Sequence, residues 1–406
     1  MLPLNWQRVR LGDIAEIIGG GTPSTQITSF WNGSINWFTP TEIGITKYVH
    51  KSQRTITPLG LKKSSAKLLP IGTILLTSRA SIGDCAILKV VATTNQGFQS
   101  LIPLEKINNE FLYYLMLTLK NKLLKLASGS TFLEVSPNKI KNLLIPLPPL
   151  NEQIAIANIL SDVDRYLYSL RALILKKESI KKALSFELLS QRKRLKGFNQ
   201  AWQRVRLGDM TTSFTKQTGF DYSASIKPTL IKEQLPNYIP FIQNKDFSGH
   251  YINYKTDYFI PNEIAIRFPQ ILLNEKCLLI SIVGSIGNVA VFNHSQDAFT
   301  GCAIAVLKFK EKKSLDFVMH FLMSASGQKS LLNIVKASSH KSIILADLRD
   351  LLIPLPPLNE QIAIANILST LDSEIISLKN KKRQFENIKK ALNHDLMSAK
   401  IRVLKK

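Results

Sequence analysis

The sequence predicts an α+β protein with two small mixed α/β domains separated by a long antiparallel two-helix coiled coil, and with internal pseudo-two-fold symmetry. Nineteen letters, LLIPLPPLNEQIAIANILS, occur at residues 143–161 and again at 351–369. The octapeptide WQRVRLGD opens each half, at 6–13 and at 202–209. Each long repeat leads into a stretch whose apolar residues recur at helical spacing. The chain therefore reads as two copies of one plan.

The first block without an exact repeat covers residues 14–142. Its short β-branched runs are separated by glycine and proline, as in GTILLTSRASIGDCAILKVV at 72–91, which is typical of strands and turns. The segment 110–125 is the best helix in the block, with Asn108 or Asn109 available as its cap. A small mixed α/β domain is expected here.

The segment 151–196 follows and contains neither glycine nor proline. Its apolar residues alternate mostly between spacings of four and three, which indicates a helix that packs against another helix. We expect it to run to the basic end before Gly197, and the same pattern returns in 359–406. The predicted domains are 1–150, the central helix 151–196, 197–358, and the C-terminal helix 359–406.

The second block, residues 210–350, is twelve residues longer than the first and differs from it at most positions. A few turns align, such as 80–83 with 284–287 and Gly97 with Gly301. We interpret the two blocks as one fold that carries different surface loops.

The net charge is +24, from 53 basic and 29 acidic residues. So large an excess indicates a polyanionic partner, and nucleic acid is favoured over a membrane surface or an acidic protein. The apolar runs are too short to cross a bilayer, and the N-terminus lacks the apolar core of a signal peptide. We expect a cytoplasmic protein with no membrane partner, whose three cysteines are buried apolar residues.

Motifs for catalysis are missing from the sequence. The double prolines at 148–149 and 356–357 have leucine on both sides, whereas an adenine methyltransferase needs an Asn/Asp-Pro-Pro-aromatic motif to hold a flipped base. No P-loop follows the glycine run 19–21, and the six histidines show no metal-ligand spacing. We therefore expect no enzyme activity and no metal. Two alternatives remain open: a stand-alone methyltransferase or nuclease with an unrecognised site, and a coiled-coil scaffold without a DNA target.

The repeated motifs resemble those of the specificity subunit of type I restriction–modification systems. The resemblance rests on the WxxxxLGD openings, the IPLPPLNEQxxIxxIL junctions and the KKAL-containing helices, the second of which ends near DLMSAKIRV. It implies that each divergent block is a target recognition domain that reads one half of an asymmetric bipartite site in double-stranded DNA. It also implies docking of two adenine-N6 methyltransferase subunits and, through them, of motor–nuclease subunits. No cofactor is then expected on this chain, because S-adenosylmethionine, ATP and magnesium belong to the partners.

The DNA contacts are expected on polar and basic loops of the two blocks. In the first block the candidates are Lys62, Lys63, Lys67, Arg79, Ser81, Thr94, Asn95, Gln96, Ser130 and Thr131. In the second block they are Gln243, Asn244, Lys245, Arg267, Ser285, Ser339, His340 and Lys341. The helix starts that border the expected docking surfaces are Asn151, Glu152, Gln153, Asn359, Glu360 and Gln361.

Overall fold

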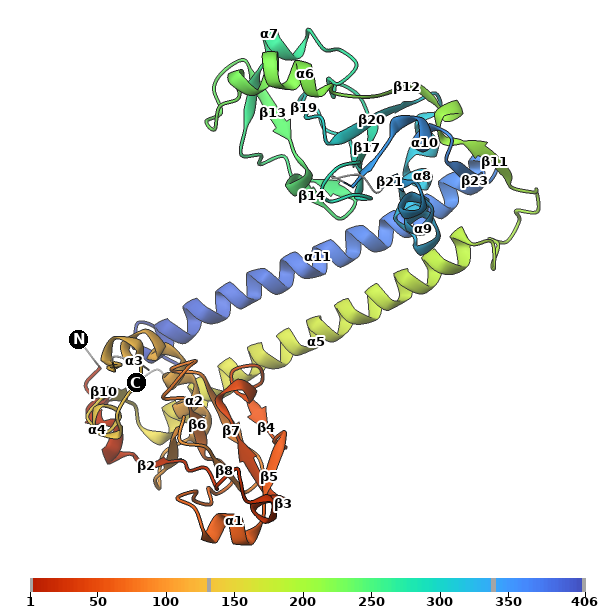
Figure 1. Cartoon of the computed structure of the whole chain (residues 1–406). Helices are drawn as coiled ribbons and strands as arrows, with labels where there is room; N and C mark the ends of the chain where they lie inside the picture. The colour runs from red at the N-terminus through yellow and green to blue at the C-terminus, as the bar shows by residue number, and fades with distance from the viewer. Residues whose placement is uncertain (1–2, 130–132, 337–340, 404–406) are drawn as a thin grey trace. The chain divides into compact units, whose positions relative to one another are not determined.

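The computed structural model describes residues 3–129, 133–336 and 341–403, and the chain divides into two compact units. Unit 1 consists of Met1–Ala172 with Asn380–Lys406, and unit 2 of Leu173–Lys379. The two longest helices, α5 (Leu150–Leu189) and α11 (Leu358–Met397), have 40 residues each, and each begins in one unit and ends in the other (Figure 1). The two units therefore differ from the predicted domains: each unit consists of one α/β domain together with a segment of both long helices.

The described residues of unit 1 form a five-stranded and a three-stranded sheet, in which only β4–β7 and β3–β8 pair in parallel. The larger sheet has the order β2 (Ala15–Gly19), β9 (Gln99–Pro103), β6 (Ile74–Leu76), β7 (Cys85–Leu88) and β4 (Tyr48–Val49). The smaller sheet has the order β5 (Arg54–Ile56), β3 (Trp31–Phe38) and β8 (Ala92–Thr94). The domain also contains the short helices α1 (Pro58–Lys62) and α4 (Pro137–Lys141).

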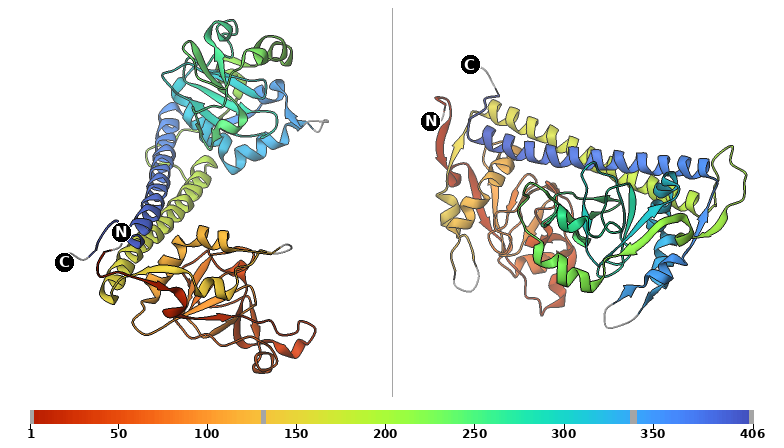
Figure 2. Two further views of the ribbon diagram at one scale, coloured as in Figure 1. Left: turned by 90° about the vertical axis from the view of Figure 1, so that its left-hand side faces the viewer. Right: turned by 90° about the horizontal axis from the view of Figure 1, so that it is seen from above.

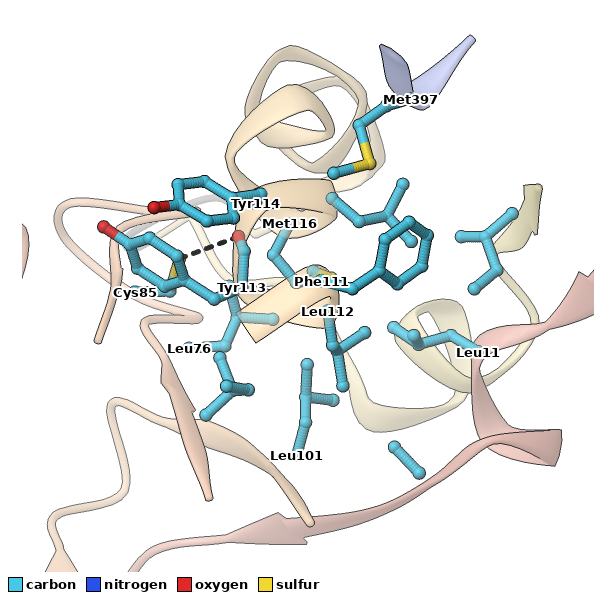
Figure 3. Close-up of a cluster of buried hydrophobic side chains, with 14 of the residues drawn as sticks. Leu11, Leu76, Cys85, Leu101, Phe111, Leu112, Tyr113, Tyr114, Met116 and Met397 are labelled. Carbon is cyan, nitrogen blue, oxygen red and sulfur yellow. Dashed lines mark hydrogen bonds between the residues drawn. The ribbon is translucent and has the colours of Figure 1, made fainter. Parts of the chain in front are cut away.

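The main core of unit 1 lies between the larger sheet and α2 (Asn109–Thr118). Phe111, Leu112 and Met116 of this helix pack with Leu76 and Leu101 of the sheet (Figure 3). Met397, at the end of α11, reaches the same core. The helix predicted at 110–125 is present but breaks at Leu119, after which α3 (Lys120–Leu126) begins. Asn108 is its cap, with Oδ1 accepting from the Phe111 amide at 2.8 Å.

Unit 2 repeats this strand order except for the edge strand β4, which has no counterpart among the described strands of its larger sheet, and this confirms the expectation of one fold with different loops. Its larger sheet has the order β12 (Thr211–Lys216), β20 (Ile304–Phe309), β17 (Cys277–Ser281) and β18 (Val289–Phe292). Its smaller sheet has the order β16 (Phe259–Pro261), β13 (Tyr238–Ile242) and β19 (Phe299–Thr300). The remaining elements are the hairpins β14 (Phe247–Ser248) with β15 (Tyr251–Ile252) and β21 (Val335–Lys336) with β22 (Ser342–Ile343), and helices α6 (Gly219–Asp221), α7 (Asn262–Ala265), α8 (Leu315–Met323), α9 (Ala325–Asn333) and α10 (Leu345–Arg349).

Strand register tests the alignment of the two blocks. Ala80 and Gly284 both have positive φ angles, 57° and 78°, so the predicted match of these turns is confirmed. The match of Gly97 with Gly301 is wrong by two positions: Ile74 pairs with Leu101 in unit 1, and its counterpart Leu278 pairs with Leu307 in unit 2. The reason is a longer turn in unit 2, where five residues separate Phe292 from Ala298 instead of the three after Leu88.

The two repeated motifs of each half pair with one another. In unit 1, β1 (Gln7–Arg10) runs antiparallel to β10 (Leu144–Leu147), with Gln7 opposite Leu147. In unit 2, β11 (Gln203–Arg206) and β23 (Leu352–Leu355) pair in the same register, with Gln203 opposite Leu355. Pro146 of β10 and Pro354 of β23 have no backbone N–H to donate. This is tolerated because each ladder has two strands, and a proline can direct its missing donor away from the partner strand.

The long helices run antiparallel within each unit. In unit 1, Asp164 and Arg171 of α5 meet Lys389 and Glu386 of α11, and the two segments lie side by side in Figures 1 and 2. In unit 2, α5 and α11 are joined by ion pairs between Glu178 and Lys379 and between Lys177 and Glu374.

Both helices end earlier than predicted, at Leu189 and Met397. Gln191 and Ala399 stand two positions beyond these ends and have φ near 60°, a left-handed conformation that stops a helix. Neither is glycine, so no residue type at these positions signals the stop.

Candidate nucleic-acid interface

The first-block candidates gather on adjoining loops of unit 1. Gly21 joins two of these loops: its amide donates to the Thr94 carbonyl at 2.8 Å, and a Cβ built on it would lie 2.3 Å from the Ala66 amide nitrogen. The Arg79 amide donates to the Gly97 carbonyl at 3.4 Å, and this hydrogen bond places the turn at 79–81 next to the loop that contains Gln96. The glycine run 19–21 therefore brings the loops near Lys67, Arg79 and Gln96 together, because a larger side chain would hold them apart.

The first-block candidates differ in how far their side chains are exposed to solvent. Lys62, Lys63, Lys67 and Gln96 are exposed and Ser81 is partly exposed, whereas Arg79 pairs with Glu134 at 2.8 Å. Asn95 supports its own turn, with Oδ1 accepting from the Gly97 amide at 2.9 Å. The prediction for Thr94 is wrong, because this last residue of β8 is only 1% exposed. Ser130 and Thr131 lie outside the described residues.

The second-block candidates also meet, around the end of β13. Gln243, Asn244 and Lys245 form a tight turn, and the Asn244 side-chain amide donates to the Val283 carbonyl at 2.6 Å. Val283 in turn bridges to Ser342, which places exposed Lys341 beside the exposed turn that contains Ser285.

Three second-block candidates stand apart from this group. Arg267 is exposed on the turn after α7, and no hydrogen bond or ion pair among the described residues joins it to the β13 loops. Ser339 and His340 fall in the stretch that the structure does not describe.

One loop of unit 1 was missed. Thr39–Glu42 follows β3 as Gln243–Asp246 follows β13, and both turns close through a backbone amide on an acidic side chain: Thr39 to Glu42 at 2.7 Å and Gln243 to Asp246 at 2.7 Å. Thr41, the counterpart of Lys245, is exposed. The signal was in the sequence, because Phe-Thr-Pro-Thr-Glu and Ile-Gln-Asn-Lys-Asp share an apolar residue followed four positions later by an acid.

The loop before β9 and β20 differs most in chemistry. By the strand register, Asn95 and Gln96 of unit 1 correspond to Gly301 and Cys302 of unit 2. Cys85 and Cys277 are buried as expected, but Cys302 is partly exposed because it lies on this loop. The two units thus present different groups from the same place in the fold.

The glutamates of the repeated motif are interior residues. Glu152 is 1% exposed and accepts from Trp6 Nε1 at 3.1 Å and from Arg402 Nε at 2.8 Å. Glu360, which is 0% exposed, accepts from Trp202 Nε1 at 3.2 Å and from Arg194 Nε at 2.9 Å. We call each set of three residues a glutamate junction.

The neighbouring glutamines are also used inside the chain. Gln153 donates to the Pro148 carbonyl at 2.9 Å, and Gln361 donates to the Pro356 carbonyl at 2.7 Å. The structure thus corrects the docking assignment of Glu152, Gln153, Glu360 and Gln361, whose buried side chains form no surface. Asn151 and Asn359 are exposed and remain docking predictions.

Each domain meets the helices through a buried polar cluster. In unit 1, Lys47 Nζ donates to Glu110 at 2.7 Å, to Tyr114 at 2.9 Å and to Ser161 at 2.8 Å. Burial lowers the pKa of Lys47, although the adjacent Glu110 carboxylate opposes that shift. The matching place in unit 2 holds His250, His320 and Asp372 with Lys181 and Ser369. Burial lowers the pKa of His320 to about 3, so its imidazole is neutral at neutral pH.

None of the helices in the described part of the chain combines the length and apolar character needed to cross a membrane.

Comparison with known proteins gives one consistent result. The family model described as the type I restriction modification DNA specificity domain matches twice, over residues 3–182 and 199–387. The MjaIX specificity subunit of Methanocaldococcus jannaschii is 29% identical over 99% of this chain and 95% of its own length. The EcoR124I/EcoR124II specificity subunit of Escherichia coli is 37% identical over 38% of this chain and 40% of its own length.

Solved structures share the fold. The S subunit of a type I system from M. genitalium aligns with a TM-score of 0.61 at 17% identity and covers 98% of both chains. A chain from a structural study of complex assembly and conformational transition in the type I system aligns with a TM-score of 0.58 at 20% identity, over 99% of this chain and 100% of that one.

Proposed function

Because this chain belongs to the family of type I restriction–modification DNA specificity subunits, we propose that it reads a bipartite DNA site, one part with the loops of each unit. A specificity subunit is the DNA-recognition component of its system and is not itself an enzyme. That family role replaces both alternatives left open by the sequence, a stand-alone methyltransferase or nuclease and a scaffold without a DNA target.

The observation that carries the proposal is the contrast between constant core and variable loops. The paired repeat motifs and the glutamate junctions recur in both units, whereas Thr39–Thr41 is replaced by Gln243–Lys245 and Asn95-Gln96 by Gly301-Cys302. Polar side chains on loops distinguish bases by their hydrogen-bonding edges. Different side chains at equivalent places should therefore read different base sequences, so the bipartite site should be asymmetric.

The basic loops would supply affinity. Lys62, Lys63 and Lys67 are exposed beside the polar loops of unit 1, and Lys245 and Lys341 are exposed in unit 2. Contacts of this kind with phosphates release counterions, so DNA binding should weaken as salt rises. A DNA target also implies that the protein works in the cytoplasm.

The repeated junction would offer one docking surface twice. Leu144 and Leu352 occupy the same place in the repeat and are 53% and 48% exposed, and Asn151 and Asn359 of the same repeated segment are also exposed. Identical exposed groups suit two copies of one partner, which we propose to be the adenine-N6 methyltransferase subunit. Motor–nuclease subunits would join through these, and S-adenosylmethionine, ATP and magnesium would act on the partner subunits.

The test is DNA methylation by the purified chain with and without its cognate methyltransferase. The chain alone should transfer no methyl group from S-adenosylmethionine, and the methyltransferase should modify a defined site only when the chain is present. Methylation by the chain alone, or methylation by the partner with the same sequence preference in its absence, would contradict the proposal.

A further inference from the structure

The polar cluster of unit 2 gathers three side chains of the kind that bind transition metals. His250 lies just before β15, His320 lies on α8, and Asp372 lies on α11. One ligand atom from each lies within 4.8 Å of the other two. Because 52 residues or more separate these positions along the chain, no local spacing in the sequence reveals the group.

Lone pairs of His250 and Asp372 converge on one cation. Lys181 Nζ lies 2.7 Å from His250 Nε2 and forms an ion pair with Asp372. A lysine ammonium can only donate, so Nε2 accepts and the imidazole proton sits on Nδ1. His250 Nε2 and Asp372 Oδ2, 3.2 Å apart, then face each other as two acceptors.

Two buried polar atoms are left without hydrogen bonds in this arrangement. They are His250 Nδ1 and Asp372 Oδ2, and the Asp372 residue is only 8% exposed. A buried polar atom without a partner has a free-energy cost of about 1–3 kcal/mol. A doubly charged ion between Nε2 and Oδ2 would convert their opposed lone pairs into two bonds.

We propose that His250, His320 and Asp372 form a binding site for a first-row divalent metal ion, of which Zn²⁺ fits best, and that this ion replaces the ammonium of Lys181. Two imidazoles and one carboxylate are a common protein ligand set for such ions. With bonds of about 2.1 Å, ligand atoms on a tetrahedral zinc ion lie about 3.4 Å apart. The His250–Asp372 pair, 3.2 Å apart, is already close to this spacing, and the ligand atom of His320, within 4.8 Å of the other two, would have to move closer by at most about 1.4 Å.

Lys181 is suited to leave. Its side chain is 21% exposed, and its long flexible stem can carry the ammonium to solvent. The bound metal ion would balance the negative charge of Asp372, as the ammonium of Lys181 does in its absence. The metal would join His250 and His320 of the recognition domain to Asp372 of α11, and so fasten the domain to the helix.

Unit 1 provides the matched control. Asp164 and Lys389 are the repeat counterparts of Asp372 and Lys181, and they pair at 2.5 Å. In place of the histidines, this cluster has Tyr114 and the amine of Lys47, which already binds Glu110. The ligand set of unit 2 is therefore not reproduced among these residues.

The experiment is a Co²⁺ titration of the full chain, followed by visible absorption and competition with Zn²⁺. One Co²⁺ per chain is expected to bind and to be displaced by Zn²⁺. His320→Gln and Asp372→Asn should abolish that absorption, whereas Asp164→Asn and the exposed-histidine variant His294→Gln should leave it unchanged. Circular dichroism verifies the fold of each variant.

Lys181→Met should change the affinity for Co²⁺ in the opposite direction, toward tighter binding. Removal of the competing ammonium should tighten Co²⁺ binding about tenfold, the scale of effects around metal ligands, whereas Lys389→Met should not. If neither the natural chain nor Lys181→Met binds Co²⁺, or if His320→Gln binds it as well as the natural chain, the site is refuted. No DNA is present in the titration, so the result is independent of the proposed recognition role.

Discussion

The two units differ most in the loops that would meet DNA and least at the two glutamate junctions. Glu152, Trp6 and Arg402 form a junction that Glu360, Trp202 and Arg194 repeat with nearly the same distances. The loops at the strand ends share only backbone turns. A buried charged network tolerates little change, whereas exposed loops can be rewritten at small cost in stability.

The helix pair shows a second difference at equivalent positions. In unit 1, the rings of Tyr166 and Phe385 pack with centroids 4.7 Å apart. Their repeat counterparts in unit 2 are Glu374 and Lys177, which form an ion pair at 2.8 Å. One unit therefore uses apolar packing where the other uses a partly exposed ion pair, so the two should respond differently to substitution and to pH.

The glutamate junctions should give the largest and most equal effects. Glu152→Ala and Glu360→Ala each leave a tryptophan N–H and an arginine without their buried acceptor. Each should lower the free energy of unfolding by about 3 kcal/mol in urea titrations. The exposed repeat positions Asn158→Ala and Asn366→Ala serve as controls, with changes within about 0.5 kcal/mol. Clearly unequal losses would show that the junctions are not equivalent.

Acid should destabilise unit 2 selectively. The pKa of His320 falls to about 3 through burial, whereas the unfolded chain takes up this proton near pH 6.5. The stability from neutral His320 is thus complete above pH 6.5 and is lost as pH falls toward 3. The groups that face it, His250, Asp372 and Lys181, are part of the same cluster.

Between pH 6.5 and 5 the natural chain should lose about 2 kcal/mol more than His320→Gln, at 1.36 kcal/mol per pH unit. Trp202 is the one tryptophan of unit 2, and its fluorescence would follow the transition. Equal pH dependence in the two proteins would contradict the assignment.

Substitution at the helix contacts should lower the free energy of unfolding more where the contact buries more apolar surface. Phe385→Ala removes the aromatic pair of unit 1 and should lower stability by about 1.5 kcal/mol. Lys177→Ala, at the equivalent position, removes a partly exposed ion pair and should lower the free energy of unfolding by about 0.5 kcal/mol. Thermal unfolding of both variants measures the difference, and a larger loss for Lys177→Ala would reverse the interpretation.

The smallest effects are expected from single basic residues of unit 1. Substitution of a lysine that contacts a phosphate should reduce the slope of log K against log salt concentration by about one. The variants to compare are Lys62→Gln, Lys63→Gln and Lys67→Gln. Fluorescence anisotropy across a salt series, with the methyltransferase bound, measures this slope. Lys125→Gln, on α3 and outside the loops, is the matched control; an equal change in that variant would point to a general charge effect.

The repeats allowed much of this organisation to be predicted. They revealed two copies, the long helices and the variable blocks, because identical sequences in equivalent surroundings fold alike. They did not reveal the helix stops at Gln191 and Ala399, because both residues adopt the left-handed conformation although neither is glycine. They also concealed the interior role of Glu152 and Glu360, since a carboxylate at a helix start resembles a surface cap.

The sites depended still more on tertiary structure. Thr94 was a reasonable DNA candidate from its neighbours, but the pairing of β8 with β3 buries it. The metal-ligating group of unit 2 comes from three separate elements, so only the fold brings it together. The Thr39–Glu42 loop, in contrast, could have been found by aligning it with Gln243–Asp246.

We propose that each unit reads one part of the DNA site independently of the other unit. This claim is tested most directly by exchanging residues 14–142 for the corresponding block of another family member and mapping N6-methyladenine produced with the cognate methyltransferase. We expect one part of the methylated site to change while the other part and the spacing between them stay the same. A change in both parts, a change in the spacing, or an unchanged site in an active complex would contradict the claim.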